Sequence, residues 1–438
     1  PRPLDPTEPE SPTLALKVAI VPALSLEPAL DPFVPIAGGP GQSAVAFYAA
    51  YADAFEAVRK RRNILLLDQR GTGESASLDC DIDDEVIDGR FSIEQTLEET
   101  VNCLGRLEHD PRLFSTSVAV QDLEALRIVL GAPQLNLYGV SYGTRVAQHY
   151  LRRFPDTTRS VILDGVVPPQ LPLGPDIALE AQRALESIFA RCAESQPCRE
   201  RFPSLANEFA ALRERLSQTP VVLQLSHPLT AKTEELAFGA QELAGAIRLL
   251  SYHPSTVALI PLLIHEAARG NVGPLASQFL MLSERMADAL SIGMHNTVVC
   301  AEDVPYIDPD RVDRGQLDAT YIGSVQLDAL EAICSVWPRG PVDDGFRAPV
   351  SSDRPVLLLS GEADPVTPPR YADLAAVRLR NARHLTGPRQ GHGQAARGCM
   401  PEIIGRFVAS ASVDGLDADC YERVHAMPFF LDFSGPAP

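Results

Sequence analysis

The chain lacks a long apolar segment. No apolar run among its 438 residues reaches the roughly 18 that a membrane-spanning helix needs, and the longest candidate, Val257 to Ile264, contains Pro261. Basic residues are also scarce: 38 Lys and Arg stand against 57 Asp and Glu, a formal net charge of −19. Nucleic acids and anionic membranes are bound by basic surfaces. The composition therefore argues against nucleic acid as a partner and against a membrane span.

Common motifs for metal and phosphate binding are missing as well. No C-x-x-C occurs, so zinc-ribbon and redox spacings are absent. The glycine-rich stretch Asp68 to Ser75 contains no G-x-x-x-x-G-K-[ST], and no G-x-G-x-x-G opens a helix there. We therefore expect neither a metal nor an organic cofactor.

Cysteine, by contrast, is present eight times. The eight fall into four local pairs: Cys80 with Cys103, Cys192 with Cys198, Cys300 with Cys334, and Cys399 with Cys420. Local disulfides would staple loops and imply an oxidising compartment. The alternative is eight reduced cysteines in a cytosolic enzyme, and the spacing leaves other connectivities open. We expect disulfides, and with them a secreted or periplasmic protein.

The pattern of apolar residues divides the chain into three parts. Up to residue 166, short apolar runs alternate with helical patterns, and the strand candidates are Asn63 to Leu67, Gln134 to Val140 and Ser160 to Leu163. Residues 167–350 are mostly helical in pattern, and the strand rhythm then returns at Pro355 to Gly361. This alternation predicts an α/β parallel sheet. We expect a core of residues 1–166 and 351–438, with residues 167–350 forming a mainly helical cap over the sheet's carboxyl edge.

A five-residue segment, Gly139 to Gly143, joins one of these strands to a helix candidate, Thr144 to Phe154. The turn needs glycines because side chains would collide where the strand and the helix nearly touch. It exposes the Ser141 hydroxyl at a helix N-terminus, where backbone N–H groups can face a developing negative charge. We interpret the segment as a nucleophile elbow, although a G-x-S-x-G pattern also arises by chance.

A serine nucleophile needs a base, and the base needs an orienting acid. Asp364 lies just past the first strand that follows the cap, and His392 lies between two glycines after a strand candidate, Ala382 to Leu385. The order Ser141, Asp364, His392 is the chain order of α/β-hydrolase triads. Glu362 is a rival acid, but it lies closer to the strand. We predict a triad of these three residues.

An apolar run ends in a Gly-Gly-Pro-Gly loop at residues 38–41. In a hydrolase with an elbow, such a loop can supply the second hydrogen-bond donor of an oxyanion hole. Because Pro40 has no N–H, either Gly39 or Gly41 must donate, and we choose Gly39 together with the N–H of Tyr142. A plain turn is the alternative.

These motifs together resemble the proline iminopeptidase and tripeptidyl aminopeptidase family of serine peptidases, which has the α/β-hydrolase fold. The segments that carry the resemblance span nearly the whole chain: Gly38-Gly39-Pro40-Gly41, Asp68-Gln69-Arg70-Gly71-Thr72-Gly73-Glu74-Ser75, Gly139-Val140-Ser141-Tyr142-Gly143-Thr144, Gly361-Glu362-Ala363-Asp364 and Gly391-His392-Gly393. We interpret the second of them as a structural loop whose Asp68 and Arg70 brace the neighbouring site loops.

The resemblance implies a serine aminopeptidase that acts on peptides with a free N-terminus. In the family, acidic cap residues hold the substrate's α-ammonium group, and Glu302 and Asp303 are the matching candidates here. Alternatively, both are solvated or pair with arginines such as Arg311. Prolyl-specific members usually carry histidine before Gly-Gly-Pro-Gly, where this chain has Ala37, so the secreted tripeptidyl-type branch is favoured.

Two other functions fit parts of the pattern. A carboxylesterase or lipase-like hydrolase with the same triad would act on small acyl esters and ignore an α-amino group. A binding protein could have kept the fold and lost turnover, but the presence of all three triad residue types in order favours an enzyme. The sequence does not indicate an oligomeric state.

Overall fold

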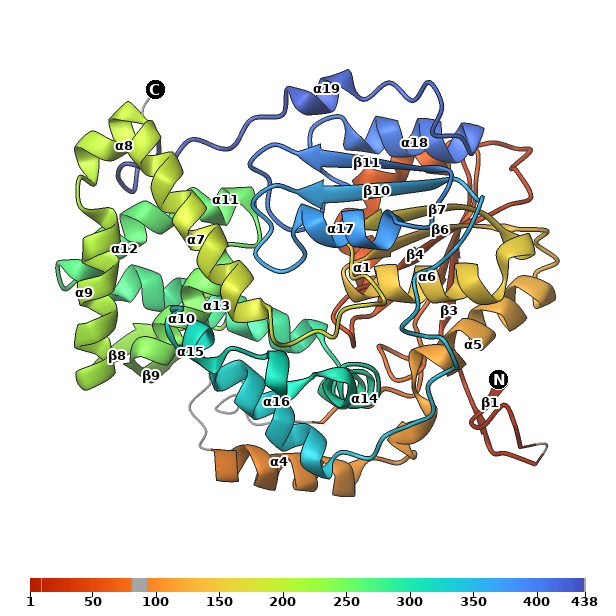
Figure 1. Cartoon of the computed structure of the whole chain (residues 1–438), viewed down its shortest axis with the longest axis horizontal. Helices are drawn as coiled ribbons and strands as arrows, with labels where there is room; N and C mark the ends of the chain where they lie inside the picture. The colour runs from red at the N-terminus through yellow and green to blue at the C-terminus, as the bar shows by residue number, and fades with distance from the viewer. Residues whose placement is uncertain (9, 81–92, 437–438) are drawn as a thin grey trace.

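A seven-stranded sheet lies at the centre of the structure, a computed structural model that describes residues 1–8, 10–80 and 93–436 (Figure 1). Its strands are β3 (Val18–Val21), β4 (Phe33–Ile36), β5 (Ile64–Leu67), β6 (Leu135–Val140), β7 (Thr158–Asp164), β10 (Val356–Gly361) and β11 (Ala382–Gly387). Their order is β11-β10-β7-β6-β4-β5-β3; β3 is antiparallel to β5, and the other paired neighbours are parallel. The predicted α/β-hydrolase fold is confirmed. A two-stranded sheet of β1 (Arg2–Pro3) and β2 (Thr13–Leu14) precedes it.

Helices cover both faces of the sheet. One face carries α5 (Thr116–Val129), α6 (Tyr142–Arg153) and α17 (Pro369–Ala376), and the other carries α1 (Ala44–Tyr51), α2 (Glu56–Arg59), α18 (Met400–Ser410) and α19 (Asp419–Glu422). Successive side chains alternate between the faces: Leu358 packs in the first cluster, whereas Leu357 and Leu359 pack in the second. Burial on both sides explains why these strands are continuous apolar runs.

A mainly helical cap is inserted between β7 and β10, and Figure 1 shows it at the left of the sheet. Its helices surround a hydrophobic cluster of their own, which includes Leu212, Leu243, Ile247, Leu263 and Phe279. The elements are α7 (Ile177–Glu194), α8 (Gln196–Arg201), α9 (Leu205–Gln218), β8 (Val221–Ser226), β9 (Thr233–Phe238), α10 (Ala240–Leu250), α11 (Pro254–Val257), α12 (Ile260–Ala268), α13 (Gly273–Ala289), α14 (Ile292–Glu302), α15 (Arg314–Asp318) and α16 (Val325–Val336).

The C-terminal end of the chain contacts the cap. The predicted boundaries, after residues 166 and 350, fall between elements. Phe429 belongs to the cap's hydrophobic cluster, and the backbone nitrogen of Phe430 donates to the carbonyl of Ala258 at 3.0 Å. The assignment of residues 1–166 and 351–438 to the core and of 167–350 to the cap stays a prediction.

All four local cysteine pairs form disulfides, as predicted. Two of them, Cys80–Cys103 and Cys300–Cys334, pack with Trp337 in one cluster that joins α4 (Ile93–Arg106) to α14 and α16. Four disulfides are typical of extracytoplasmic proteins. In the part of the chain that the structure describes, we find no helix of the length and apolarity needed to cross a membrane.

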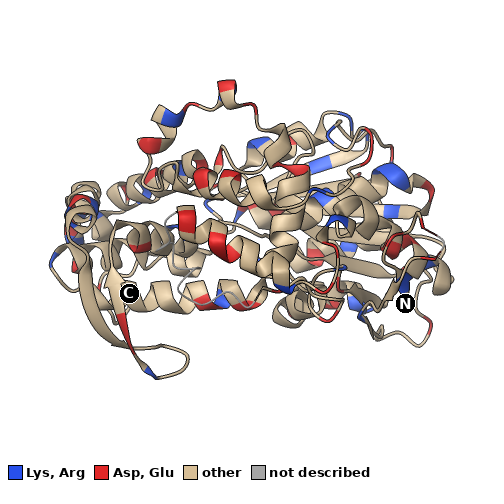
Figure 2. Ribbon diagram, turned by 90° about the horizontal axis from the view of Figure 1, so that it is seen from below, with Lys and Arg blue, Asp and Glu red and all other residues tan. Residues whose placement is uncertain are grey.

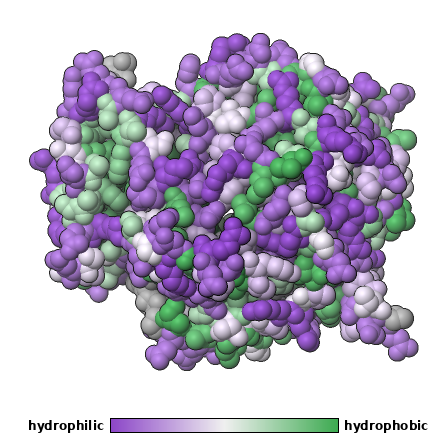
Figure 3. All heavy atoms as spheres, in the orientation of Figure 1, coloured by the Kyte–Doolittle hydropathy of each residue, from purple (hydrophilic) through white to green (hydrophobic). Residues whose placement is uncertain are grey.

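Acidic and basic residues are interspersed along the ribbon of both the core and the cap (Figure 2). Among the described residues, this view shows no long block of basic residues, in keeping with the net charge of −19. The face seen in Figure 3 is mostly hydrophilic, with apolar residues gathered in small patches.

Candidate active site

Ser141 lies at the junction of β6 and α6, with φ of 53° and ψ of −125°. A positive φ is uncommon for a residue with a side chain, and such strain concentrates at functional sites. The neighbouring glycines are required: a Cβ on Gly139 would lie 2.2 Å from the carbonyl oxygen of Gly143, and one on Gly143 would lie 2.3 Å from that of Ile36. The predicted close approach of strand and helix is present, and it holds Ser141 on the wall of a cavity.

His392 and Asp364 meet at the carboxyl edge of the sheet. Nδ1 of His392 lies 2.8 Å from Oδ2 of Asp364, and the Thr367 hydroxyl donates to the same oxygen at 2.8 Å. The backbone nitrogens of Val366 and Thr367 donate to Oδ1 at 2.8 and 2.9 Å. Burial alone would raise the pKa of the Asp364 carboxyl, but His392 and these donors outweigh burial and lower it. Burial alone would likewise lower the pKa of His392, but Asp364 raises it above 6.5.

This contact leaves Nε2 of His392 as the nitrogen available to Ser141. Both residues line the same cavity, although no hydrogen bond joins these two described side chains. Such contacts are often long in the absence of substrate and tighten on binding. The rival acid, Glu362, is exposed and accepts a hydrogen bond from the backbone nitrogen of Arg389 at 2.8 Å. Asp364 is therefore the carboxylate that contacts the histidine.

The Gly-Gly-Pro-Gly loop lies directly against the elbow. A Cβ on Gly38 would lie 3.0 Å from Cβ of Ser141, and Gly39 has φ of 99°, which favours glycine. Among the described residues, the backbone nitrogens of Gly39 and Tyr142 donate to no other group. Tyr142 is the first residue of α6, so the helix dipole adds partial positive charge at this point. The arrangement can therefore accommodate an oxyanion.

The loop that follows β5 supports the glycine loop through Asp68 but not through Arg70. Oδ1 of Asp68 accepts hydrogen bonds from the Ser43 hydroxyl at 2.7 Å and from the Val45 nitrogen at 3.0 Å, so Asp68 supports the glycine loop, as predicted. Arg70 instead pairs with Asp122 at 2.7 Å. It also donates to the carbonyls of Leu4 and Leu113, both at 2.8 Å. The predicted role of Arg70 in bracing the site loops is wrong, because its guanidinium ties α5 to the N-terminal segment.

Asp164, at the end of β7, is a site residue to which the sequence assigned no role. Its two carboxylate oxygens accept the backbone N–H of Gln394, each at 2.8 Å, and Oδ2 also accepts from the Ala395 nitrogen at 2.9 Å and the Tyr138 hydroxyl at 2.8 Å. It is fully buried, and burial raises the pKa of this carboxyl. Its position at the carboxyl end of a parallel strand was the signal that could have found it.

The triad opens onto a cavity of about 470 Å3 between the core and the cap. That volume lies within the usual range for small-ligand sites. Helices α10, α13, α14 and α16 supply its cap side, and the lining is largely apolar, with Phe47, Val140, Leu173, Ile177, Leu290 and Leu330 among its residues. Across the described residues, no group of three or more His, Cys, Asp or Glu is placed to hold a metal ion.

The predicted amine-binding residues lie behind the cavity wall. Glu302 is fully buried and accepts hydrogen bonds from the Thr116 nitrogen at 2.7 Å and the Thr116 hydroxyl at 2.9 Å. Asp303, also fully buried, pairs with Arg145 at 2.9 Å and accepts the Leu173 nitrogen at 2.7 Å. Neither carboxylate is among the residues that line the cavity. Their binding of an α-ammonium group stays a prediction, with a structural role as the alternative.

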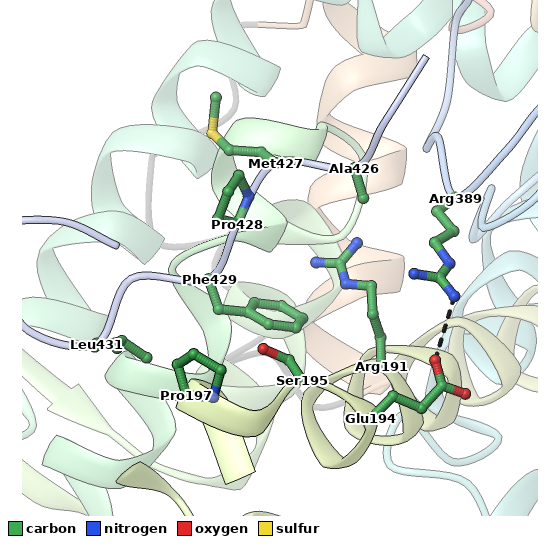
Figure 4. A pocket seen from close by; sticks show the side chains of 10 residues that line it. All are labelled: Arg191, Glu194, Ser195, Pro197, Arg389, Ala426, Met427, Pro428, Phe429 and Leu431. Carbon is green, nitrogen blue, oxygen red and sulfur yellow. Dashed lines mark hydrogen bonds and ion pairs between the residues drawn. The ribbon is translucent and has the colours of Figure 1, made fainter. Parts of the chain in front are cut away.

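A second pocket, of about 400 Å3, lies where the C-terminal segment crosses the cap (Figure 4). The guanidinium carbon of Arg191 lies 4.0 Å from the ring centroid of Phe429, and Arg389 pairs with Glu194 at 3.2 Å. Burial and the nearby charge of Arg389 lower the pKa of Arg191 to about 10. Ser141, Asp364 and His392 do not line this pocket, so it is separate from the site.

Comparison with known proteins finds a family match in the C-terminal part of the chain. Residues 319–420, which run from the last part of the cap through Asp364 and His392, match the family described as TAP-like protein. This segment of the α/β hydrolase is thus similar to the TAP-like family. This confirms the resemblance inferred from the motifs.

The relatives are distant. Serine protease Hip1 of Mycobacterium tuberculosis is 24% identical over 424 residues, which cover 87% of this chain and 79% of that protein. Tripeptidyl aminopeptidase of Streptomyces lividans is 29% identical over 168 residues, or 33% of this chain and 31% of that protein. The crystal structure of proline iminopeptidase from Mycobacterium smegmatis superposes with a TM-score of 0.44 at 16% identity, covering 91% of this chain and 95% of that one. The family match and the two named relatives support a serine hydrolase from a family that includes peptidases.

Proposed function

We propose that this TAP-like hydrolase is a serine peptidase that cleaves peptide bonds near the free N-terminus of peptides. The observation that carries the proposal is the 2.8 Å contact between Asp364 and His392, beside the cavity that Ser141 and His392 line. The names of the Mycobacterium and Streptomyces relatives support peptide bonds as the target. The four disulfides support a secreted or periplasmic location.

In this mechanism Ser141 attacks the scissile carbonyl while His392 takes its proton. Asp364 orients the imidazole and stabilises the imidazolium, and the N–H groups of Gly39 and Tyr142 hold the oxyanion. His392 then protonates the leaving amine. Water, activated by the same histidine, hydrolyses the acyl-enzyme.

The bounded shape of the cavity favours chain ends over internal segments. Core loops form one side of the space and cap helices the other, so a short acyl segment fits more easily than a continuous chain. In this proposal Glu302 and Asp303, which do not line the cavity, attract the substrate's ammonium group through the cavity wall. Glu302→Gln separates this effect from a purely structural role.

A small chromogenic panel tests the proposal. It contains free Pro-, Ala- and Ala-Ala-Pro- amides, N-blocked versions of each, and a short-chain acyl ester. We expect cleavage of the free-amine peptides only, and the best substrate length gives the number of residues released. Ser141→Ala should abolish turnover of every substrate and labelling by a fluorophosphonate probe. Full turnover by that variant would contradict the mechanism.

A carboxylesterase is the second candidate, because apolar side chains form most of the cavity lining. It would hydrolyse the acyl ester without regard to a free amine. Ester cleavage at a higher kcat/KM than any peptide in the panel, with no effect of N-blocking, would move the assignment to this function.

A further inference from the structure

Three polar side chains on the cap side of the active-site cavity each carry a buried atom without a hydrogen-bond partner. Arg248 comes from α10, His295 from α14 and Gln326 from α16, and all three line the cavity. We refer to them as the cap polar cluster. The unpaired atoms are Nε of Arg248, Nδ1 of His295 and Oε1 of Gln326, and none of them has a partner among the described residues. Buried polar atoms are normally paired, and these three belong to residues that border a cavity where a substrate can bind.

The cluster is cationic where the chain as a whole is acidic. Arg248 forms no hydrogen bond or ion pair with any residue that the structure describes, and its charge acts on both His295 and Tyr321. Asp164 is the one carboxylate on the described lining of the cavity, and both of its oxygens are already occupied by protein donors. Arg248 is partly buried, and a charge that loses contact with water without gaining a partner is costly. A substrate anion would supply the partner that the protein does not.

The cluster also lies close to the reacting groups. Tyr252 follows Ser251, the C-cap of the helix that carries Arg248, and both Arg248 and Tyr252 line the cavity. The Tyr252 ring lies 5.6 Å from the His392 ring, and its carbonyl accepts the His392 nitrogen at 2.8 Å. His295 lines the cavity together with Pro40, in the glycine loop next to Ser141, and its Nδ1 has no partner among the described residues. A group bound here is therefore within reach of a substrate held by the triad.

We propose that the cap polar cluster binds a carboxylate of the substrate, so that the enzyme prefers peptides with an acidic group in the cavity. The inference rests on the proposed function and names its substrate class. Arginine suits this task because its planar fork matches a carboxylate with two hydrogen bonds, and Gln326 can add an amide donor. The carboxylate is either an acidic side chain on the acyl segment or the C-terminal carboxylate of a short leaving peptide.

Two matched substrate series distinguish these sources. The first is Ala-Ala-Ala p-nitroanilide with Glu or the isosteric Gln at each of the three positions in turn. The second is a set of short peptides whose C-terminus is a free acid or an amide, with cleavage followed by chromatography. We expect a ratio of kcat/KM, acid over neutral, of at least about tenfold in one series. A ratio near one in both series overturns the inference, while measurable turnover of the neutral members leaves the proposed function standing.

Variants then assign the preference to the cluster. Arg248→Met should bring the favoured ratio to about one, because a general loss of activity affects both members of a pair equally. Arg285→Met, at an exposed position on α13 away from the cavity lining, is the matched control and should keep the ratio. An unchanged ratio in Arg248→Met would contradict the assignment.

If circular dichroism shows that Arg248→Met does not fold, two other variants decide. Gln326→Leu should lower the ratio several-fold, and Arg248→Lys, which keeps the charge but loses the fork, should lower it without abolishing it. Wild-type ratios in both variants would overturn the assignment. If the wild-type enzyme cleaves no peptide in either series, the proposed function itself is wrong, and the failure lies there.

Discussion

Both carboxylate oxygens of Asp164 lie 2.8 Å from the backbone nitrogen of Gln394. The end of β7 is thereby tied to the loop that carries His392, two residues earlier. We expect Asp164→Ala to lower kcat roughly ten- to hundredfold with a smaller change in KM, because it releases the base from its position. Steady-state kinetics checks this. Loss of stability with unchanged kcat in the folded fraction would contradict a positioning role.

The isosteric variant Asp164→Asn isolates the charge of the same residue. The Asp164 charge raises the pKa of His392, so its removal should shift the acid limb of kcat/KM to lower pH while an acceptor for Gln394 is kept. Comparing the pH profiles of kcat/KM for Asp164→Ala and Asp164→Asn separates the positioning role of Asp164 from the effect of its charge. If the acid limb of Asp164→Asn stays at the wild-type pH, Asp164 has a purely geometric role.

The pH dependence of the wild-type enzyme follows from His392. The base must be neutral to accept the Ser141 proton, and Asp364 raises its pKa above 6.5 despite burial. Activity should therefore rise with pH through a midpoint above 6.5. Asp364→Asn should move this midpoint down and lower kcat about 10⁴-fold, the size typical of triads that lose their acid. A wild-type midpoint below 6.5 would contradict this account.

Glu302→Gln tests the predicted ammonium contact. If the carboxylate attracts the α-ammonium group, kcat/KM should fall far more for free-amine peptides than for a neutral ester. If Glu302 only holds Thr116, losses on both substrates should be equal. The panel of free-amine peptide and acyl ester measures the difference, and we expect the first result.

The same variant has a stability signature. Burial raises the pKa of Glu302 to about 7, from an ordinary 4.5. The folded state then holds its proton more tightly than the unfolded state, so stability is lost as pH rises from about 4.5 to 7. Glu302→Gln should escape this loss and gain roughly 1–3 kcal/mol relative to the wild type between pH 4.5 and 8. Urea unfolding at both pH values checks this, and a pH-independent difference would contradict it.

The buried pair of Asp303 and Arg145 supports the elbow helix. Both side chains are almost completely inaccessible to solvent, so Asp303→Asn would leave an unpaired buried guanidinium. We expect a loss of about 3–5 kcal/mol in the free energy of unfolding. The exposed pair of Asp353 and Arg380 is the matched control, and Asp353→Asn should change stability far less. Equal effects of the two substitutions would argue against a structural role for the buried pair.

Local patterns predicted the features that short segments determine. The elbow could be predicted because strand, glycine turn and helix are adjacent, and the cysteine pairs because each lies within 34 residues of its partner. Helix α10, Ala240–Leu250, lies in the stretch whose pattern predicts mostly helix. The direction of the Arg70 guanidinium was not predictable, because its partners Leu4, Leu113 and Asp122 are brought near only by folding.

By itself, the sequence determined the fold class, the family and the order of Ser141, Asp364 and His392, since parallel strands deliver their carboxyl ends to one edge. Tertiary structure decided which polar side chains line the cavity. Arg248, His295 and Gln326 come from three helices, and packing brings them onto one wall while it turns Glu302 and Asp303 behind that wall. Helical periodicity distinguishes the buried face of a helix from its exposed face. It does not show whether the buried face packs against a neighbouring helix or borders a cavity.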